Sequence, residues 1–297
     1  MIYTITLNPS IDRKIEVDTL ELAEVTVVGS SSNFGGKGVN TAIALDKVGV
    51  SNCAICLVPV EFQNNDLLNA MFFTKSSSMR ENITIIDKNR KSIHLRAKSH
   101  CDGKDVYPIF EYIRRNIKAS DWVVFSGSVP ECDDINLREV IIATLSNLNC
   151  HIIVDTLYFS SADLMRIRPK LIKVNRSEFR EIFGLPPETQ IDEKLLIQFT
   201  DKYGHEVILT DGQNEILSTF GSEFIELPIG TDNTTKGNSA LGSGDFFIAG
   251  FLSGMEEKLP TSECIKLGAI FGIQRQKYDN IHDVELDKKS LSRINFM

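Results

Sequence analysis

The stretch that decides the fold class is residues 122–154, which read WVVFSGSVPECDDINLREVIIATLSNLNCHIIV. Two short apolar runs, Trp122–Phe125 and Ile152–Val154, flank a segment in which apolar residues recur at helical spacing from Ile135 to Leu148. A strand, a helix and a second strand in this order are typical of parallel strands joined by a crossover helix. The sequence therefore predicts an α/β protein with a mostly parallel central sheet flanked by helices.

The same alternation of strands and helices extends through the rest of the chain. Further strand-like runs are Ile2–Leu7, Leu171–Val174 and Val207–Leu209, and a helical segment begins at Gly38 and ends at Gly49. No internal repeat, low-complexity tract or long linker interrupts the pattern. We therefore expect one domain that spans all 297 residues.

Four short strand-like segments break this alternation and predict a small accessory sheet. Lys14–Val17 and Val25–Val28 are short, and Ile83–Ile86 and Ile93–Ala97 flank a polar turn as the two strands of a hairpin do. We expect these strands to form a flap beside the main domain.

Charge and composition exclude several classes of protein. The chain carries 40 acidic against 32 basic side chains, whereas nonspecific binding to nucleic acid or to an anionic membrane requires a broad basic surface. No apolar run approaches the roughly 20 residues that a membrane-spanning helix needs. The amino terminus lacks the basic segment and the cleavage site of a signal peptide, so we expect a cytoplasmic protein.

The cysteines predict neither a disulfide framework nor a zinc site. Six cysteines in this length are too sparse, and their spacing does not supply two ligand pairs. Cys53 and Cys56 form a Cys-x-x-Cys sequence, but it lies in an apolar run whose residues alternate between the two faces of a strand. We expect both to be buried thiols.

The first motif that carries chemistry is Asn33-Phe34-Gly35-Gly36-Lys37-Gly38-Val39-Asn40, directly before a helix. Glycines let the backbone approach a ligand closely, and a helix N-terminus presents free N–H groups to an anion or a polar sugar. The motif is not a Walker loop, because Ser31 and Gly38 stand where that loop has Gly and Ser or Thr. Taken alone, it is also compatible with a tight strand-to-helix turn.

The second motif is Leu241-Gly242-Ser243-Gly244-Asp245-Phe246-Phe247, which opens an apolar helical segment. It lacks the third glycine of a dinucleotide-binding fingerprint. Amides that converge on one point suit the charge on a phosphoryl group in transfer, and the carboxylate of Asp245 can take a proton from an attacking hydroxyl. The alternative is an aspartate that only stabilises the helix dipole.

The third motif, Lys173-Val174-Asn175-Arg176-Ser177-Glu178, follows a buried strand. Asn175 and Glu178 are three residues apart, so they fall on one face of a helical turn, where their oxygens can organise a hydrated Mg²⁺ ion. The alternative is a capping box, with Asn175 as N-cap and Glu178 as its partner. The two interpretations are compatible.

Taken together, these motifs resemble the ribokinase-like (PfkB) family of carbohydrate kinases, and within it the 1-phosphofructokinase and tagatose-6-phosphate kinase branch. The similar segments are Thr4–Asp12, Gly35–Asn40, Met79–Ile83, Ser126–Pro130, Asn175 with Glu178, Thr210–Gly212 and Gly242–Asp245. The resemblance covers the whole chain. It implies a Rossmann-like ribokinase fold and a small β-sheet lid, formed here by roughly residues 12–32 and 80–105.

The resemblance also implies site residues. Those implied to hold the sugar, its phosphate and the lining of the same cleft are Asp12, Gly36, Lys37, Asn40, Arg80 and Ser128. Those implied for the general base and the anion hole are Asp245, Gly242, Ser243 and Gly244. Those implied near ATP are Lys173, Asn175, Glu178, Thr210 and Gly212, of which Asn175 and Glu178 are also implied near Mg²⁺.

The chain departs from its branch at the substrate end. Where the branch usually has an Asn-Arg pair before the glycines, this chain has Glu24-Val25-Thr26, so one cation for the substrate phosphate is missing. The lid segment Lys91–Ala97 also differs from the usual pattern, and its Arg96 is a candidate to replace the missing charge. These departures leave the catalytic end intact and make the identity of the sugar the open question.

The resemblance implies an ATP-dependent kinase that converts a ketohexose phosphate into a bisphosphate, with Asp245 as general base. The acceptor would be fructose 1-phosphate, tagatose 6-phosphate or fructose 6-phosphate. The alternatives are a kinase of another sugar, sugar alcohol or nucleoside, and a non-catalytic sugar-phosphate sensor. ATP and Mg²⁺ are the implied cofactors, and a monovalent cation and a homodimer formed through the lid remain open.

Overall fold

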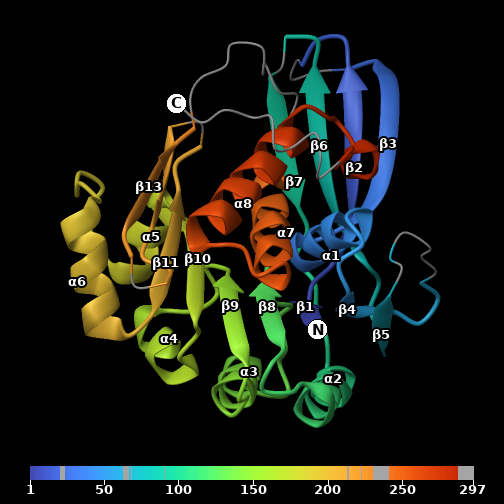
Figure 1. Cartoon of the computed structure of the whole chain (residues 1–297). Coiled ribbons are helices and arrows are strands. Elements are labelled where there is room, and N and C mark those ends of the chain that lie inside the picture. Colours follow the sequence, from blue (N-terminus) through green and yellow to red (C-terminus); the bar gives the residue numbers. More distant parts are fainter. Residues whose placement is uncertain are drawn as a thin grey trace.

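The computed structural model has a large central sheet between two layers of helices and a smaller sheet at one end (Figure 1). The small sheet lies beyond the carboxyl ends of the central strands, at the top of the view in Figure 1. The residues that the structure describes are 1–20, 24–62, 67, 69–89, 91–212, 214–221, 223–229 and 241–286.

Within these residues the central sheet has nine strands, in the order β13-β12-β11-β10-β9-β8-β1-β4-β5. They are β1 (Ile2–Thr6), β4 (Asn52–Pro59), β5 (Ala70–Lys75), β8 (Trp122–Ser126), β9 (His151–Asp155), β10 (Leu171–Asn175), β11 (Glu206–Thr210), β12 (Glu215–Ser218) and β13 (Ile225–Pro228). Neighbours pair in parallel, except that β12 is antiparallel to both β11 and β13. The predicted parallel sheet is confirmed, and Cys53 and Cys56 are free, buried thiols in β4.

Strand β8 shows why the run Trp122–Phe125 is apolar at every position. Val123 and Phe125 belong to the core on one face of the sheet, and Trp122 and Val124 belong to the core on the other face. Because helices cover both faces, a central strand has no solvent-facing side and must be apolar on both.

The helices form two layers. One face is covered by α1 (Lys37–Lys47), α7 (Ser243–Glu256) and α8 (Thr261–Gln276), and the other by α2 (Gly103–Asn116), α3 (Leu137–Ser146), α4 (Ser161–Ile167), α5 (Arg176–Phe183) and α6 (Glu193–Tyr203) (Figure 1). A short 3₁₀ turn, η1 (Ile281–Asp283), follows α8. Among the described helices, none combines the length and apolar character that crossing a bilayer requires.

The small sheet has the order β3-β2-β6-β7. Its strands are β2 (Ser10–Val17), β3 (Val27–Gly35), β6 (Arg80–Asp87) and β7 (Ser92–Arg96). Strands β6 and β7 are antiparallel, which confirms the predicted hairpin, and β2 joins them in parallel through β6.

The prediction of a strand over Val25–Val28 is wrong in its extent. Strand β3 begins at Val27 and continues through three serines to Gly35, because its backbone pairs with β2 along its whole length. Serines carry no apolar alternation, so this pairing leaves no signal in the sequence. As a result, the small sheet runs directly into the glycine motif.

Candidate active site

A cavity of about 840 Å³ lies between the small sheet and the carboxyl ends of the central strands. It is lined by every residue that the family resemblance implies for the site. For the acceptor these are Asp12, Gly36, Lys37, Asn40, Arg80 and Ser128. For phosphoryl transfer and ATP they are Gly242, Ser243, Gly244, Asp245, Lys173, Asn175, Glu178, Thr210 and Gly212. The fold thus brings residues from both ends of the chain to the sheet edge where α/β proteins bind their ligands.

A single glycine turns the chain from the small sheet into α1. Helix α1 begins at Lys37, so Gly36 alone makes the turn after β3, with a φ of 135°. A Cβ at Gly36 would lie 2.9 Å from Cγ2 of Thr6 and 3.4 Å from Cα of Pro9. Only glycine therefore fits both the conformation and the space, and the first turn of α1 is held against the end of β1.

A buried carboxylate, Asp155, pairs with both lysines of the site. Its Oδ1 lies 2.9 Å from Nζ of Lys37 and 3.7 Å from Nζ of Lys173. Burial opposes the charge on Asp155, but the two ammonium groups outweigh it and hold its pKa below the usual range. Burial likewise opposes the charge on Lys37, but Asp155, Asp245 and Glu178 outweigh it and raise its pKa. Lys37 therefore stays charged beside the cavity.

Asp245 lies in the first turn of α7 and is 4% exposed. Its Oδ2 accepts a 2.7 Å hydrogen bond from Nδ2 of Asn40. Burial and then the negative charge of Asp155 raise the pKa of Asp245 to about 7, while Lys37, the bond from Asn40 and Lys173 oppose the shift. A carboxyl group with this pKa can accept and release a proton near neutral pH.

The turn that opens α7 leaves free amides beside this carboxyl group. Gly242 adopts a φ of 83°, and its carbonyl accepts a 3.1 Å hydrogen bond from the N–H of Asp245. The N–H groups of Ser243 and Gly244 precede the first bonds inside the helix, so they face the helix end. A Cβ at Gly244 would contact Nζ of Lys173, which places that ammonium group directly over the turn. Amides and ammonium together suit an anion.

Asn175 and Glu178 form a capping box at the start of α5. Oδ1 of Asn175 accepts from the N–H of Glu178, and Oε2 of Glu178 accepts from the N–H of Asn175, both at 2.9 Å. The second oxygen of Glu178, Oε1, is 4.0 Å from Nζ of Lys37. Oδ2 of the buried Asp155 has no hydrogen-bond partner among the described residues.

These oxygens fit a Mg²⁺ ion only if it keeps much of its water. In the part of the chain that the structure describes, no three acidic, histidine or cysteine side chains gather as a metal site would require. Mg²⁺ at phosphoryl-transfer sites is usually held by one or two carboxylates, waters and substrate phosphates. Glu178 lines the cavity and its Oε1 is not used by the capping box, so this oxygen matches that need.

Thr210 and Gly212 lie at the end of β11, next to the end of β10. Oγ1 of Thr210 donates to the carbonyl of Val174 at 3.4 Å, and Gly212 adopts a φ of 58°. Ile216 and Ile229 add apolar surface to the same part of the cavity. Polar groups beside an apolar wall are typical of a site for a planar ring.

A chain of hydrogen bonds orients the small-sheet residues that face the cavity. Nδ2 of Asn82 donates to Oδ1 of Asp12 at 2.8 Å. Arg80 donates from Nη1 to Oδ1 of Asn82 and from Nε to the carbonyl of Asn8, both at 3.1 Å. Nδ2 of Asn8 donates to Oγ of Ser128 at 3.0 Å. The small sheet and the loop after β8 are therefore joined around this end of the cavity.

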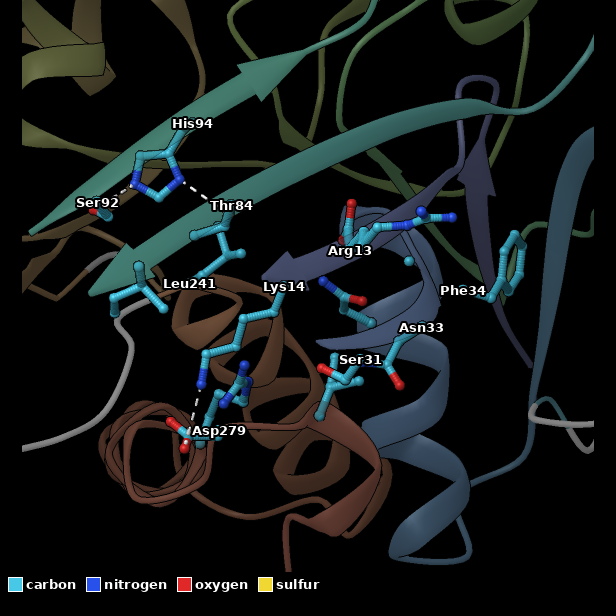
Figure 2. Close-up of a pocket in the computed structure, with 16 residues that line it drawn as sticks. Arg13, Lys14, Ser31, Asn33, Phe34, Thr84, Ser92, His94, Leu241 and Asp279 are labelled. Atoms are coloured by element: carbon cyan, nitrogen blue, oxygen red, sulfur yellow. Dashed lines mark hydrogen bonds and ion pairs between the residues drawn. The ribbon is translucent and has the colours of Figure 1, made fainter. Parts of the chain in front are cut away.

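Figure 2 shows a second cavity, of about 740 Å³, that adjoins the first. The side chains that line both are those of Asp12, Asn40, Thr84, His94 and Leu241. The ring of His94 lies between Oγ1 of Thr84 at 3.1 Å and Oγ of Ser92 at 3.2 Å. Nζ of Lys14 lies 3.5 Å from Oδ2 of Asp279, so an ion pair joins the small sheet to the segment after α8.

Arg275 is a charged residue of the site that the sequence does not single out. It is 4% exposed, and its Nη1 donates to the carbonyl of Tyr278 at 2.6 Å. Its Nε has no hydrogen-bond partner among the described residues and lies 3.3 Å from where a Cβ would stand on Gly242. Burial lowers the pKa of Arg275, while Asp245 and Asp279 oppose the shift.

Asp155 is the other residue of the site that is not among those predicted from the sequence, although its position in the sequence does indicate it. It directly follows the predicted strand Ile152–Val154, and the carboxyl ends of parallel strands meet at one edge of a sheet. Arg275 leaves no such signal, because a lone arginine near the end of a helix is more often a surface residue.

Comparisons with known proteins agree with this architecture. A family model described as "pfkB family carbohydrate kinase" matches residues 5–279. The chain is 25% identical over 285 residues to a 1-phosphofructokinase of Bacillus subtilis, covering 92% of this chain and 91% of that protein. It is 27% identical over 315 residues to a 1-phosphofructokinase of Borreliella burgdorferi, covering 99% and 97%.

A solved structure confirms the fold. Phosphofructokinase-2 from Escherichia coli, in complex with potassium, superimposes with a TM-score of 0.82 at 19% identity, covering 98% of this chain and 99% of that one. A structure titled possible 1-phosphofructokinase from Thermotoga maritima has a TM-score of 0.74 at 18% identity, covering 98% and 96%. The ribokinase-like fold with a separate four-stranded sheet is therefore the fold of this chain.

Proposed function

Because the chain belongs to the pfkB family of carbohydrate kinases and is thus a phosphotransferase with an alcohol group as acceptor, we propose that it phosphorylates a ketohexose phosphate. The γ-phosphate of ATP would pass to a hydroxyl of fructose 1-phosphate, or of tagatose 6-phosphate or fructose 6-phosphate, and give a bisphosphate. The two curated relatives described above are both named 1-phosphofructokinase, which favours fructose 1-phosphate.

The observation that carries this proposal is the position of Asp245. A buried carboxyl group with a pKa of about 7 lies in the first turn of a helix, beside free amides and in one cavity with Lys37 and Arg80. A base, an anion site and a site for a charged acceptor are the three parts that phosphoryl transfer to a sugar phosphate requires.

In the proposed reaction, the carboxylate of Asp245 accepts the proton of the acceptor hydroxyl. The hydroxyl oxygen forms a bond to the γ-phosphorus, and the bond from that phosphorus to the bridging oxygen breaks, which releases ADP. The N–H groups of Ser243 and Gly244 and the ammonium group of Lys173 stabilise the negative charge on the transferring group. Asn40 holds the carboxylate in place through its 2.7 Å hydrogen bond.

Mg²⁺ is part of the proposal. Glu178, beside Asn175, would hold it with its waters and the phosphates of ATP. When bound, it would neutralise phosphate charge during transfer. A monovalent cation is a further candidate cofactor, because one structural neighbour was solved with potassium.

The small sheet would act as a lid and as a dimer interface. Its inner face lines both cavities, whereas its other face exposes apolar side chains, including Val28 at 60% and Ile93 at 43%. Exposed apolar residues on a sheet face favour association with a second copy. We propose that the protein forms a homodimer through this face and that it is located in the cytoplasm.

The test is coupled ADP release across a panel of acceptors. The panel holds fructose 1-phosphate, fructose 6-phosphate, tagatose 6-phosphate, free fructose, ribose and a nucleoside. We expect kcat/KM for one sugar phosphate to exceed that for every unphosphorylated compound by about tenfold or more, because a charged group contributes strong contacts. A preference for an unphosphorylated acceptor, or no ADP release with any compound of the panel, would contradict the proposal.

A further inference from the structure

Two arginines on neighbouring strands of the small sheet face the same cavity. Arg96 on β7 pairs in register with Asn82 on β6, and Arg80 lies two residues from Asn82 on the same strand. Residues two apart on a strand, and residues directly opposite on paired strands, share a face of the sheet. Both guanidinium groups line the cavity of about 840 Å³, together with Ser128.

Neither arginine forms an ion pair within the residues that the structure describes. Burial lowers the pKa of Arg80, and the positive charge of Arg96 lowers it further, while Asp12 opposes the shift. The two cations repel each other, and the single carboxylate of Asp12 in the same cavity offsets only part of their combined charge. An anion bound between them would remove this repulsion, so the pair favours an anionic ligand.

Arg80 is already oriented for such a ligand. Two of its nitrogens donate to the carbonyl of Asn8 and to Asn82, and the remaining Nη2 has no partner in the described part of the chain. Oγ of Ser128 accepts from Asn8, which leaves its own hydroxyl proton available as a donor. A donor that is held in place before binding loses little entropy when it binds.

Lys14 is a further cation on this face of the small sheet, and it is already paired with acidic side chains. Nζ of Lys14 lies 2.8 Å from Oε1 of Glu16 and 3.5 Å from Oδ2 of Asp279. In the same row across the sheet as Lys14, Thr84 and His94 hydrogen-bond to each other. The unpaired positive charge is therefore confined to the end of the sheet where Arg80 and Arg96 lie.

We propose that Arg96 supplies the second cationic contact to the phosphate group of the acceptor and determines the preference of this chain for a phosphorylated sugar. The ligand class, a sugar phosphate, rests on the proposed function, and the assignment of the selecting residue goes beyond it. The acceptor binds with its phosphate against Arg80, Arg96 and Ser128, and its sugar extends past Asp12 toward Asp245.

Direct binding to the nucleotide-free protein tests this assignment. Calorimetric titration with fructose 1-phosphate, fructose 6-phosphate and tagatose 6-phosphate compares wild type with Arg96→Gln, Arg96→Lys and Lys98→Gln. Lys98 is the matched control, because it lies two residues from Arg96, is 80% exposed and pairs with Glu131 at 2.7 Å away from the cavity. Arg96 is itself exposed, so its variants are expected to fold.

We expect Arg96→Gln to weaken the tightest of the three sugar phosphates by about 10- to 100-fold, the usual effect of losing a charge-assisted contact. Arg96→Lys should recover part of the affinity, and Lys98→Gln should change it by less than about twofold. Unchanged affinity in Arg96→Gln, or equal weakening in Arg96→Gln and Lys98→Gln, would overturn the assignment.

Turnover separates this inference from the proposed function. If wild type binds a sugar phosphate through Arg96 but releases no ADP with it, the proposed function fails and the assignment of Arg96 stands. If wild type turns over a sugar phosphate and Arg96→Gln binds it normally, the assignment fails and the proposed function stands. If wild type binds none of the three compounds, both fail.

Discussion

Asn40 donates a 2.7 Å hydrogen bond from Nδ2 to Oδ2 of Asp245, across a separation of 205 positions in the chain. Oγ1 of Thr41 donates to the carbonyl of the same aspartate at 3.2 Å. Helix α1, which begins at the glycine motif, therefore holds the start of α7 through a side chain and through the backbone. The acceptor motif and the base are therefore joined into one hydrogen-bonded unit.

The first prediction concerns the pH dependence of turnover. Asp245 must be deprotonated to accept the hydroxyl proton, and its pKa is about 7. We therefore expect kcat/KM to fall tenfold for each pH unit below about 7 and to level off above it. ADP release measured between about pH 5.5 and 9 checks this. A flat profile, or a midpoint near the ordinary aspartate value of about 4, would contradict the assignment of the base.

The second prediction is that Asp245→Asn lowers activity and raises stability. Without the base, kcat should drop by roughly 10²–10⁴-fold while the sugar phosphate still binds. Since burial raises the pKa of Asp245, the folded state prefers the protonated form; that preference is fully present below the unfolded pKa of about 3.9 and is lost as pH rises through about 7.

At about pH 8 the wild type carries a buried charge that the asparagine variant lacks. The variant should then be more stable by on the order of 1–4 kcal/mol, and the difference should shrink at about pH 5. Thermal unfolding at both pH values measures this. Equal stability of the two proteins at the higher pH would show that the buried charge has no free-energy cost, and would contradict the raised pKa of Asp245.

The sequence predicts the central sheet well because its strands are apolar on both faces. Trp122 to Phe125 must fill two cores at once, and this requirement is visible as an unbroken apolar run. Strand β3 is different. Its serines pair with β2 through the backbone alone, so neither the alternation nor the length of the strand can be predicted from Val25–Val28.

The site is predictable where a motif coincides with the end of a strand. Asn175 at the end of β10 and Thr210 at the end of β11 are brought together because the ends of parallel strands share one edge of the sheet. Asp155 could be found by the same rule. Arg275 could not, because its role depends on how α8 packs against the start of α7, which is set by tertiary structure.

The third prediction contrasts two glycines of α7. A Cβ at Gly244 would meet the mobile end of Lys173, so Gly244→Ala should leave the free energy of unfolding within about 1 kcal/mol of wild type. It should lower kcat by about tenfold or more, because the ammonium group is displaced from the anion site. Steady-state kinetics and thermal unfolding of the same preparation test both statements.

Gly250→Ala is the control for this experiment. There a Cβ would lie 2.8 Å from Cγ of Phe271 and 2.9 Å from Cα of Gly268, in the rigid contact between α7 and α8. We expect a loss of about 1–3 kcal/mol in stability and normal kcat in the folded protein. The reverse result, in which Gly250→Ala loses activity and Gly244→Ala keeps it, would show that Lys173 is not part of the anion site.

The fourth prediction assigns Arg275 a positioning and electrostatic role. Its guanidinium group is buried beside the turn at Gly242 and interacts with the charge of Asp245. Arg275→Met removes a positive charge from the surroundings of the base, so the pKa of Asp245 should rise and the acid limb of the kcat/KM profile should move upward, by less than about one pH unit. Arg275→Lys keeps the charge and should keep the profile.

Stability distinguishes this role from a purely structural one. Nε of Arg275 is buried without a partner among the described residues, so replacing the side chain with methionine removes an uncompensated group as well as the bond to Tyr278. The two effects oppose each other, and the melting temperature should change little. If Arg275→Met unfolds at a much lower temperature but keeps the wild-type pH midpoint, Arg275 only supports the packing of α8. The pKa of Asp245 is then set without it, by burial, the bond from Asn40 and the charges of Asp155, Lys37 and Lys173.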